Sequence, residues 1–364
     1  MIDRRRAIHR PGLALLSLIV LLPACTTESA GDATVTTNAP ETLRKGDDLD
    51  VTVEGIRDHL KALQKIASAN EGIRAAGEPG YDASVRYVAR TMRAAGYEVS
   101  FDAWRTPIFE QRSPTRLEPE GSARGTFEDG QDLRAMLYSG SGSIRAPLFP
   151  LSFDAEGTGR EGPGCSPNAF DGTPAGAVVL LRPGPCFTRD QVVNAQQAGA
   201  GAVIVAYPEF TPGNGLRRPT LLSPDGIAIP ALAVTDEVGR RLSALGSGTS
   251  VRVAVDARNP TRLLRNVIAE TPGGSALKVV MAGGHLDSVV DGPGINDNGS
   301  GVATLIEIAE ELIGSEPRNK VRFVFWAGEE YGLLGSRHYV DSLNPLEIRD
   351  IAVYLNFDML ASPN

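Results

Sequence analysis

Three apolar runs near the end of the chain are each followed by ionisable residues, and this feature constrains the fold most. The runs lie at residues 277–283, 321–327 and 351–357. Continuous apolar runs of this length are typical of strands in a sheet that is covered on both faces. Because patterns typical of helices, at 300–313 and 331–342, alternate with them, the sequence predicts an α/β fold with a mixed, mostly parallel sheet.

The ionisable residues that follow these runs form a set with metal-binding chemistry. The set contains one histidine and five carboxylates: His285, Asp287, Asp297, Glu329, Glu330 and Asp358. In open α/β sheets ligands bind beyond the carboxyl ends of the strands, so we expect these side chains to converge there. Clustered carboxylates repel one another unless a cation lies among them, and oxygen ligands with one imidazole suit zinc. Since Glu329 and Glu330 are adjacent and point differently, one can bind metal while the other acts as a base.

The first 49 residues have the pattern of an export segment. A basic region with Arg4, Arg5, Arg6 and Arg10 precedes an apolar run, 13–22, that is too short to span a bilayer. The following Leu22-Pro23-Ala24-Cys25 resembles a bacterial lipobox, which implies a signal peptide at 1–24 and lipidation of Cys25. Residues 25–49 are polar without periodicity, as in a flexible tether. The protein is therefore expected outside the cytoplasm, anchored to the membrane by lipid or, alternatively, secreted.

Three cysteines fit this location. With Cys25 used by the anchor, Cys165 and Cys186 remain, and an even pair in an exported protein indicates a disulfide. Metal binding by the two thiols is the alternative.

The pattern of apolar residues changes twice along the chain, which predicts a domain that is split by an insertion. An amphipathic helix at 53–68, a second helix at 84–95 and a strand at 97–103 lie in the segment 50–130. The segment 131–262 has short apolar runs between turns, and the α/β pattern returns over 263–364. We therefore expect 50–130 and 263–364 to pack around one sheet, with a β-rich insertion between them. His59, in the first helix, has no acidic or thiol partner at ligand spacing and is predicted to be structural.

The inserted segment resembles a protease-associated domain, which in peptidases serves as a lid or substrate-binding module. The motifs that carry the resemblance are Gly164-Cys165-Ser166-Pro167, Arg182-Pro183-Gly184-Pro185-Cys186-Phe187 and Ala195-Gln196-Gln197-Ala198-Gly199-Ala200-Gly201-Ala202.

The flanking segments resemble the secreted di-zinc aminopeptidases, the bacterial leucyl aminopeptidase-like family of co-catalytic metallopeptidases. Four motifs occur in the family's order and spacing: His285-Leu286-Asp287, Gly294-Ile295-Asn296-Asp297-Asn298-Gly299-Ser300-Gly301, Gly328-Glu329-Glu330 and Asn356-Phe357-Asp358-Met359. The resemblance implies a three-layer zinc-exopeptidase fold and hydrolysis of the N-terminal peptide bond of peptides.

The same resemblance implies a role for each strand-end residue. It assigns two zinc ions per complete subunit to four ligands: His285 and Asp358 on one ion, Glu330 on the other, and Asp297 bridging both. It makes Glu329 the general base and Asp287 the residue that orients His285, and it implies a cis peptide bond after Asp297.

The family also uses a second histidine ligand, downstream of the motif that contains Asp358. The sequence given stops at Asn364, and His338 lies in the helix predicted at 331–342, where we expect it to pack. The resemblance therefore implies a C-terminally incomplete peptidase domain, which alone would be weakly active or inactive.

A net charge of −8 argues against nucleic acid as a partner. The expected partners are instead peptides with a free N-terminus, and the protein is expected to be a monomer. Three alternatives stay open. One is a carboxypeptidase-like relative, which needs basic residues that are not obvious near the motifs. The others are a mono-zinc aminoacyl-cyclase relative and a non-catalytic binding protein on the same scaffold.

Overall fold

The computed structural model describes residues 49–120, 127–151, 153, 162–208, 216–312 and 314–362. The predicted signal peptide, Cys25 and all of the predicted tether except residue 49 lie outside this part of the chain. No helix within these ranges is long and apolar enough to cross a bilayer.

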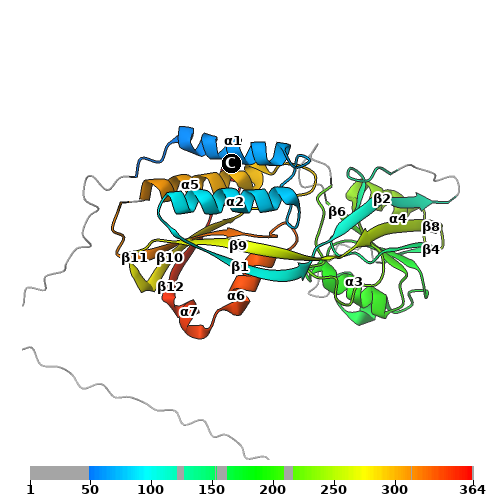
Figure 1. Cartoon of the computed structure of the whole chain (residues 1–364). Coiled ribbons are helices and arrows are strands. Elements are labelled where there is room, and N and C mark those ends of the chain that lie inside the picture. The colour runs from blue at the N-terminus through cyan, green and yellow to red at the C-terminus, as the bar shows by residue number, and fades with distance from the viewer. Residues whose placement is uncertain are drawn as a thin grey trace, which may run out of the picture. The chain divides into compact units, whose positions relative to one another are not determined.

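The first sheet has five strands and carries the predicted α/β pattern (Figure 1). In spatial order the strands are β1 (Glu98–Pro107), β9 (Thr261–Glu270), β11 (Asn319–Trp326), β10 (Ser275–His285) and β12 (Ile351–Asn356). β10 runs parallel to both of its neighbours, β11 and β12, whereas β9 runs antiparallel to β11 and to β1. The sheet is therefore mixed, and its three parallel strands are the predicted apolar runs.

Helices cover both faces of this sheet, which confirms the three-layer arrangement. In Figure 1, three helices lie on one side of the sheet: α1 (Val53–Ser68), α2 (Pro79–Ala94) and α5 (Gly301–Leu312). On the other side lie α6 (Leu334–Ser342) and α7 (Pro345–Asp350).

The two predicted N-terminal helices are present. α1 has the bounds that its periodicity predicts, and Thr52 caps it by accepting the backbone N–H of Gly55. α2 begins five residues earlier than predicted, at Pro79, because proline is favoured in the first turn of a helix.

β12 does not meet the expectation of a strand covered on both faces. Val353, Tyr354 and Leu355 are each more than two-fifths exposed. The strand lies at the edge of the sheet and pairs only with β10 among the described residues. The apolar run therefore predicts the strand correctly, but not the burial of its side chains.

A second sheet of seven strands contains the predicted insertion. In spatial order its strands are β2 (Glu110–Pro119), β8 (Ser250–Arg258), β4 (Gly142–Pro150), β5 (Val178–Leu181), β6 (Ala202–Tyr207), β7 (Ala231–Thr235) and β3 (Leu133–Ala135). The helices of this part are α3 (Thr188–Gln197), α4 (Asp236–Ala244) and the short 3₁₀ helix η2 (Pro167–Phe170). All four side chains of β5 are buried, and they belong to a hydrophobic core that continues into the five-stranded part.

The disulfide between Cys165 and Cys186 is present, as predicted, and joins two residues that are 21 positions apart in the sequence.

The division between the two sheets comes earlier in the chain than residue 130, the boundary that the sequence suggests. β2 pairs with β8, so residues 110–119 belong to the seven-stranded sheet. The chain crosses between the sheets at residues 108–109 and returns at 259–260. The sequence does not identify β2 as part of the insertion, because its many charged residues leave no short apolar run of the kind that marks the other strands. The division into domains itself stays a prediction.

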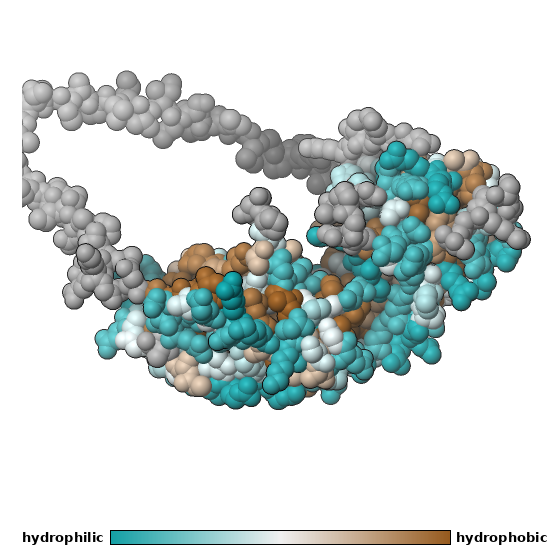
Figure 2. Space-filling model, turned by 90° about the horizontal axis from the view of Figure 1, so that it is seen from above, coloured by the Kyte–Doolittle hydropathy of each residue, from teal (hydrophilic) through white to brown (hydrophobic). Residues whose placement is uncertain are grey.

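Both sheets belong to one compact unit of the chain. Figure 2 shows one face of it, on which hydrophilic residues predominate and hydrophobic residues appear between them, as is usual for a protein surface in water.

Candidate metal centre

The predicted strand-end residues meet at one edge of the five-stranded sheet. His285 is the last residue of β10, Glu329 and Glu330 follow β11, and Asp358 follows β12. Since these three strands are adjacent and parallel, their carboxyl ends share an edge. Asp297 joins them from η3 (Ile295–Ser300), the π-helical turn that leads into α5.

The imidazole of His285 is the centre of the cluster. Its Nε2 atom lies 3.0 Å from Oδ1 of Asp297, 3.7 Å from Oδ1 of Asp358 and 3.9 Å from Oε2 of Glu329. His285 is only 3% exposed, whereas the carboxylates around it are partly open to solvent. The arrangement places several negative oxygens around one nitrogen at the rim of a buried strand end.

The ligand atoms of His285, Asp297 and Glu330 all lie within 4.8 Å of one another, which is close enough to share a cation. Oε1 of Glu330 is buried and accepts no hydrogen bond from the residues that the structure describes. A buried carboxylate oxygen without a donor costs free energy unless a cation satisfies it. The donor set and this orphaned oxygen therefore fit a divalent metal such as zinc.

The other nitrogen of the His285 ring is held by main chain. Nδ1 lies 3.1 Å from the carbonyl oxygen of Asp287, which can only accept, so Nδ1 donates and Nε2 is the ring nitrogen that faces the cluster. The carboxylate of Asp287 is farther from the ring, at 3.7 Å. Instead, its two oxygens accept the backbone N–H groups of Glu329 and Glu330. The geometry thus gives the Asp287 carboxylate a contact that sequence reasoning did not assign to it.

The expected cis peptide bond is present between Asp297 and Asn298. The Asn298 side chain donates to the carbonyl oxygen of Phe357 at 2.8 Å and accepts from the backbone N–H of Gly301 at 2.9 Å. This amide therefore links the turn that carries Asp297 to the segment that carries Asp358.

Burial and mutual repulsion shift the protonation of the cluster. Burial raises the pKa of Glu330 to about 8, and the charges of Asp287 and Asp297 contribute further. Burial also raises the pKa of Glu329. The pKa of His285 is raised despite its burial, because the nearby carboxylates of Asp287, Asp297 and Asp358 stabilise the protonated ring. Without a cation, Glu329, Glu330 and His285 therefore keep their protons to a higher pH than usual. The positive charge of a bound metal would lower these pKa values.

Arg74 is a structural residue of the site that sequence reasoning missed. It is fully buried in the loop between α1 and α2, and its guanidinium donates to the carbonyl oxygens of Leu286, Pro293 and Gly294. Burial lowers the pKa of Arg74 to about 10, so it remains charged at neutral pH. Its partners are more than 200 residues away in the sequence, and no local pattern indicates them.

Two cavities adjoin the cluster. The larger, of about 830 Å³, is bordered by Asp297 and Glu330 together with residues of the inserted segment and its flanks. The smaller, of about 230 Å³, is bordered by His285, Glu329 and Asp358. Residues of the cluster therefore border two separate cavities.

Basic residues line the larger cavity, contrary to the expectation that none lies near the motifs. Arg134, Arg217 and Arg218 border it, although they are distant in the sequence from the strand ends. Arg134 donates to Asp291 at 2.7 Å. The Nε atoms of Arg134 and Arg218 are buried without a hydrogen-bond partner among the described residues.

The two remaining described histidines lie outside this cluster. His338 stacks on Trp104, with 4.5 Å between ring centroids, and its Nε2 lies 3.2 Å from Asp102, which confirms that it packs. His59 is predicted to be structural because no acidic residue stands at ligand spacing in the sequence, yet the fold brings it an acidic partner from a distant segment. Nε2 of His59 contacts Glu310 at 3.2 Å, because α5 packs against α1.

Comparison with family models matches two parts of the chain. Residues 266–364 match the model of peptidase family M28, and residues 145–242 match that of the PA domain. The first match contains every strand-end residue described above, and the second lies within the seven-stranded part.

Curated relatives and solved structures agree with these matches. The chain is 42% identical to a probable lipoprotein aminopeptidase of Mycobacterium tuberculosis over 86% of its own length, and 38% identical to an aminopeptidase of Pseudomonas aeruginosa over 84%. It spans 60% and 57% of the lengths of these two relatives.

Among solved structures, an aminopeptidase from Aneurinibacillus sp. strain AM-1 matches with a TM-score of 0.70 at 26% identity, over 85% of this chain and 70% of that one. A zinc aminopeptidase from Bacillus subtilis matches with a TM-score of 0.65, also at 26% identity, over 86% and 70%.

Proposed function

We propose that this chain, in which residues 266–364 are an M28 peptidase segment and residues 145–242 a PA domain, belongs to an exported zinc aminopeptidase. The observation that carries the proposal is the convergence of His285, Asp297 and Glu330 at the ends of parallel strands, with a buried Glu330 oxygen that has no donor. The aminopeptidase relatives and the zinc aminopeptidase structure support this choice of reaction and metal.

The residues that would hold the metal are those that the resemblance to the di-zinc aminopeptidases implies. We assign His285 and Asp358 to one zinc ion, Glu330 to a second, and Asp297 to both. When bound, zinc polarises the scissile carbonyl and lowers the pKa of a water molecule. The carbonyl of Asp287 keeps the Nε2 lone pair of His285 directed at the cluster, which any metal ligand of this type requires.

Glu329 acts as the general base in this proposal. Its carboxylate borders the smaller cavity, and its backbone is fixed by the hydrogen bond to Asp287. Burial raises its pKa, which makes the carboxylate a better proton acceptor. It takes a proton from the attacking water and passes it to the nitrogen of the leaving amine. Proton transfer of this kind contributes about 10²–10⁴-fold to the rate.

Recognition of a free N-terminus falls to the acidic residues of the larger cavity. Glu78 and Asp291 border it, and carboxylates attract a protonated α-amino group. Such recognition restricts cleavage to the first peptide bond, which is the behaviour of an exopeptidase.

The experiment that tests the proposal uses the full-length protein loaded with zinc. We expect two zinc ions per subunit and rapid release of 4-nitroaniline from an aminoacyl-4-nitroanilide, with at least about 100-fold slower release from its N-acetylated form. Equal rates on the two substrates would exclude recognition of the free amine. Full folding with no hydrolysis of either substrate would favour the binding-protein alternative.

A second candidate, a carboxypeptidase, is favoured by one observation. The arginines that line the larger cavity offer charged donors to a C-terminal carboxylate. Release of the last residue from an N-acetylated dipeptide with a free C-terminus would identify this reaction, and the aminopeptidase proposal predicts that this substrate stays intact.

Export and anchoring are a separate part of the proposal. The support is the similarity to a probable lipoprotein aminopeptidase and the sequence around Cys25. We expect the protein in the membrane fraction of the producing cell and the variant Cys25→Ser in the soluble fraction. An unchanged distribution would contradict a lipid anchor at this residue.

A further inference from the structure

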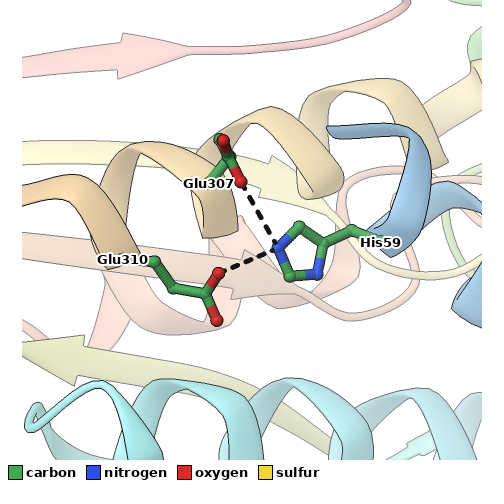
Figure 3. Close-up of side chains that lie close together, drawn as sticks. All are labelled: His59, Glu307 and Glu310. Atoms are coloured by element: carbon green, nitrogen blue, oxygen red, sulfur yellow. Dashed lines mark hydrogen bonds and ion pairs between the residues drawn. The ribbon is translucent and has the colours of Figure 1, made fainter. Parts of the chain in front are cut away.

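A second cluster of metal-ligating side chains lies between two of the helices that cover the sheet. Figure 3 shows His59, from α1, facing Glu307 and Glu310, from α5. The two glutamates are three residues apart, so they project from the same side of their helix. One ligand atom from each residue lies within 4.8 Å of the other two.

Both carboxylates approach the same nitrogen. Nε2 of His59 lies 3.2 Å from Oε2 of Glu310 and 3.9 Å from Oε2 of Glu307 (Figure 3). Ligands bound tetrahedrally to zinc at about 2.0–2.1 Å are ~3.3 Å apart. The cluster therefore has the dimensions of a zinc site with only small side-chain adjustments.

The opposite nitrogen of the imidazole is tethered as it is in metal sites. Nδ1 of His59 lies 2.7 Å from the hydroxyl of Tyr87, on α2. When Nδ1 of a neutral ring donates to this oxygen, Nε2 presents a lone pair to two carboxylates, and a cation bound between them supplies the attraction.

The chain around Glu307 is built to keep this carboxylate in place. Its Oε1 accepts both the backbone N–H and the hydroxyl of Thr52, at 3.0 and 2.8 Å, so that Oε2 is left to face the imidazole. A Cβ atom at Gly55 would lie 1.9 Å from Oε2, so only glycine at this position of α1 leaves room for the carboxylate.

Burial and charge favour an ion here. His59 is 8% and Glu307 6% exposed, while the Glu310 side chain is 40% exposed and gives an ion a path from solvent. Within the described ranges, His59 is the only ion-pair partner of either glutamate. Two carboxylates and one imidazole thus leave negative charge without compensation in a largely buried place.

We propose that His59, Glu307 and Glu310 form a divalent-cation site for zinc, separate from the strand-end cluster, which fastens α1 to α5. The ligand set of one imidazole and two carboxylates is of the type that binds zinc in proteins. Because the site lies between helices and outside the two cavities at the strand ends, its role is to stabilise the fold. The inference does not depend on the proposed peptidase activity.

The test counts zinc in the full-length protein after chelation, reloading and dialysis. We expect His59→Gln and Glu310→Gln each to bind one zinc equivalent fewer than the unaltered protein. The matched control Glu311→Gln alters an exposed neighbour on the same helix and should keep the full count. Asp297→Asn, at the strand ends, should lose metal there and keep the equivalent between the helices, which separates the two sites.

Two further readouts keep the proposal open to refutation. Added zinc should raise the melting temperature of the metal-free protein, and the part of this rise that belongs to the helix site should vanish in Glu310→Gln, which is conservative and partly exposed. Tyr87→Phe should weaken that equivalent by about 10–100-fold. An unchanged zinc count in both His59→Gln and Glu310→Gln would overturn the proposal and leave a protonated imidazole as the link between the helices.

Discussion

The buried carboxylate of Asp287 accepts a hydrogen bond from the backbone N–H of Glu329 over 3.1 Å. Its second oxygen accepts the N–H of Glu330 at 3.3 Å. The contact joins the segment after β10 to the loop after β11, so the end of one strand fixes the direction of both glutamates that follow its neighbour. The residue expected to orient an imidazole therefore also positions the predicted base and the predicted ligand beside it.

Substitution of Asp287 by asparagine should weaken the metal centre. The amide nitrogen of Asp287→Asn cannot accept, so at least one of the two backbone N–H groups loses its partner. We expect zinc affinity at the strand ends to fall by about 10–100-fold, with a lower kcat in the full-length enzyme. Titration of the metal-free protein with zinc measures the first effect. Asp341→Asn, an exposed aspartate on α6, is the matched control and should leave the affinity unchanged.

Substitution of Glu329 by glutamine should separate metal binding from catalysis. The side chain keeps its size but loses the ability to take a proton, so the full-length enzyme should retain zinc and lose about 10²–10⁴-fold in kcat. Zinc content and steady-state rates on an aminoacyl-4-nitroanilide check both parts. Glu316→Gln, in an exposed loop, should match the unaltered enzyme. A near-normal rate in Glu329→Gln would remove Glu329 from the role of base.

Local pattern was sufficient for the elements that carry the strand-end cluster. The 3.6-residue period identifies α1, and apolar runs identify β10, β11 and β12. Since parallel neighbours end at one edge, the convergence of His285, Glu330 and Asp358 follows from the order of strands and helices. The roles of these residues stay predictions.

Contacts between segments that are distant in the sequence could not be predicted from local sequence patterns. Arg74 meets the strand-end loops only after the sheet has formed, and His59 finds Glu310 only when α1 packs on α5. Arg134, on β3, and Arg218, in the connection between β6 and β7, reach the larger cavity from the inserted part of the chain. Each pairing depends on tertiary packing, which no local period or motif records.

Removal of the Arg74 side chain should destabilise the fold. In Arg74→Met three carbonyl oxygens lose their donor, and each unsatisfied buried acceptor costs about 1–3 kcal/mol. We expect the free energy of unfolding to fall by about 3 kcal/mol or more, as measured by urea denaturation. Arg86→Ala, on the exposed side of α2, should change it by less than about 0.5 kcal/mol. A similar small change in Arg74→Met would show that water replaces the guanidinium.

The stability that Glu110 contributes, through its ion pairs with Arg258 and Arg262, should decrease at acidic pH. Glu110, on β2, accepts hydrogen bonds from Arg258 and Arg262, which lower its pKa even though its burial acts in the opposite direction. A carboxyl with a lowered folded-state pKa adds stability above its unfolded pKa, and this stability is lost as pH falls through the folded value. Glu110→Gln should therefore be less stable than the unaltered protein at pH 7, and the difference should shrink below about pH 4. Urea denaturation at both pH values measures it, and a difference that does not depend on pH would contradict the ion pairs.

In the proposed peptidase, Arg218 should contribute to binding a substrate that carries a free carboxylate. The guanidinium borders the larger cavity together with Asp297 and Glu330, and its Nε has no partner among the described residues. Burial and the nearby charge of Arg134 lower its pKa, so an added carboxylate would offset both effects. Hydrogen bonds to charged groups contribute about 1.5–3 kcal/mol, which corresponds to roughly 10–100-fold in binding.

For the full-length protein, Arg218→Ala should raise KM by that factor for a dipeptide with a free C-terminus and leave KM for its C-terminal amide nearly unchanged. Arg57→Ala, an exposed arginine on α1, should alter neither value. Equal effects on both peptides would show that Arg218 shapes the cavity without binding the carboxylate.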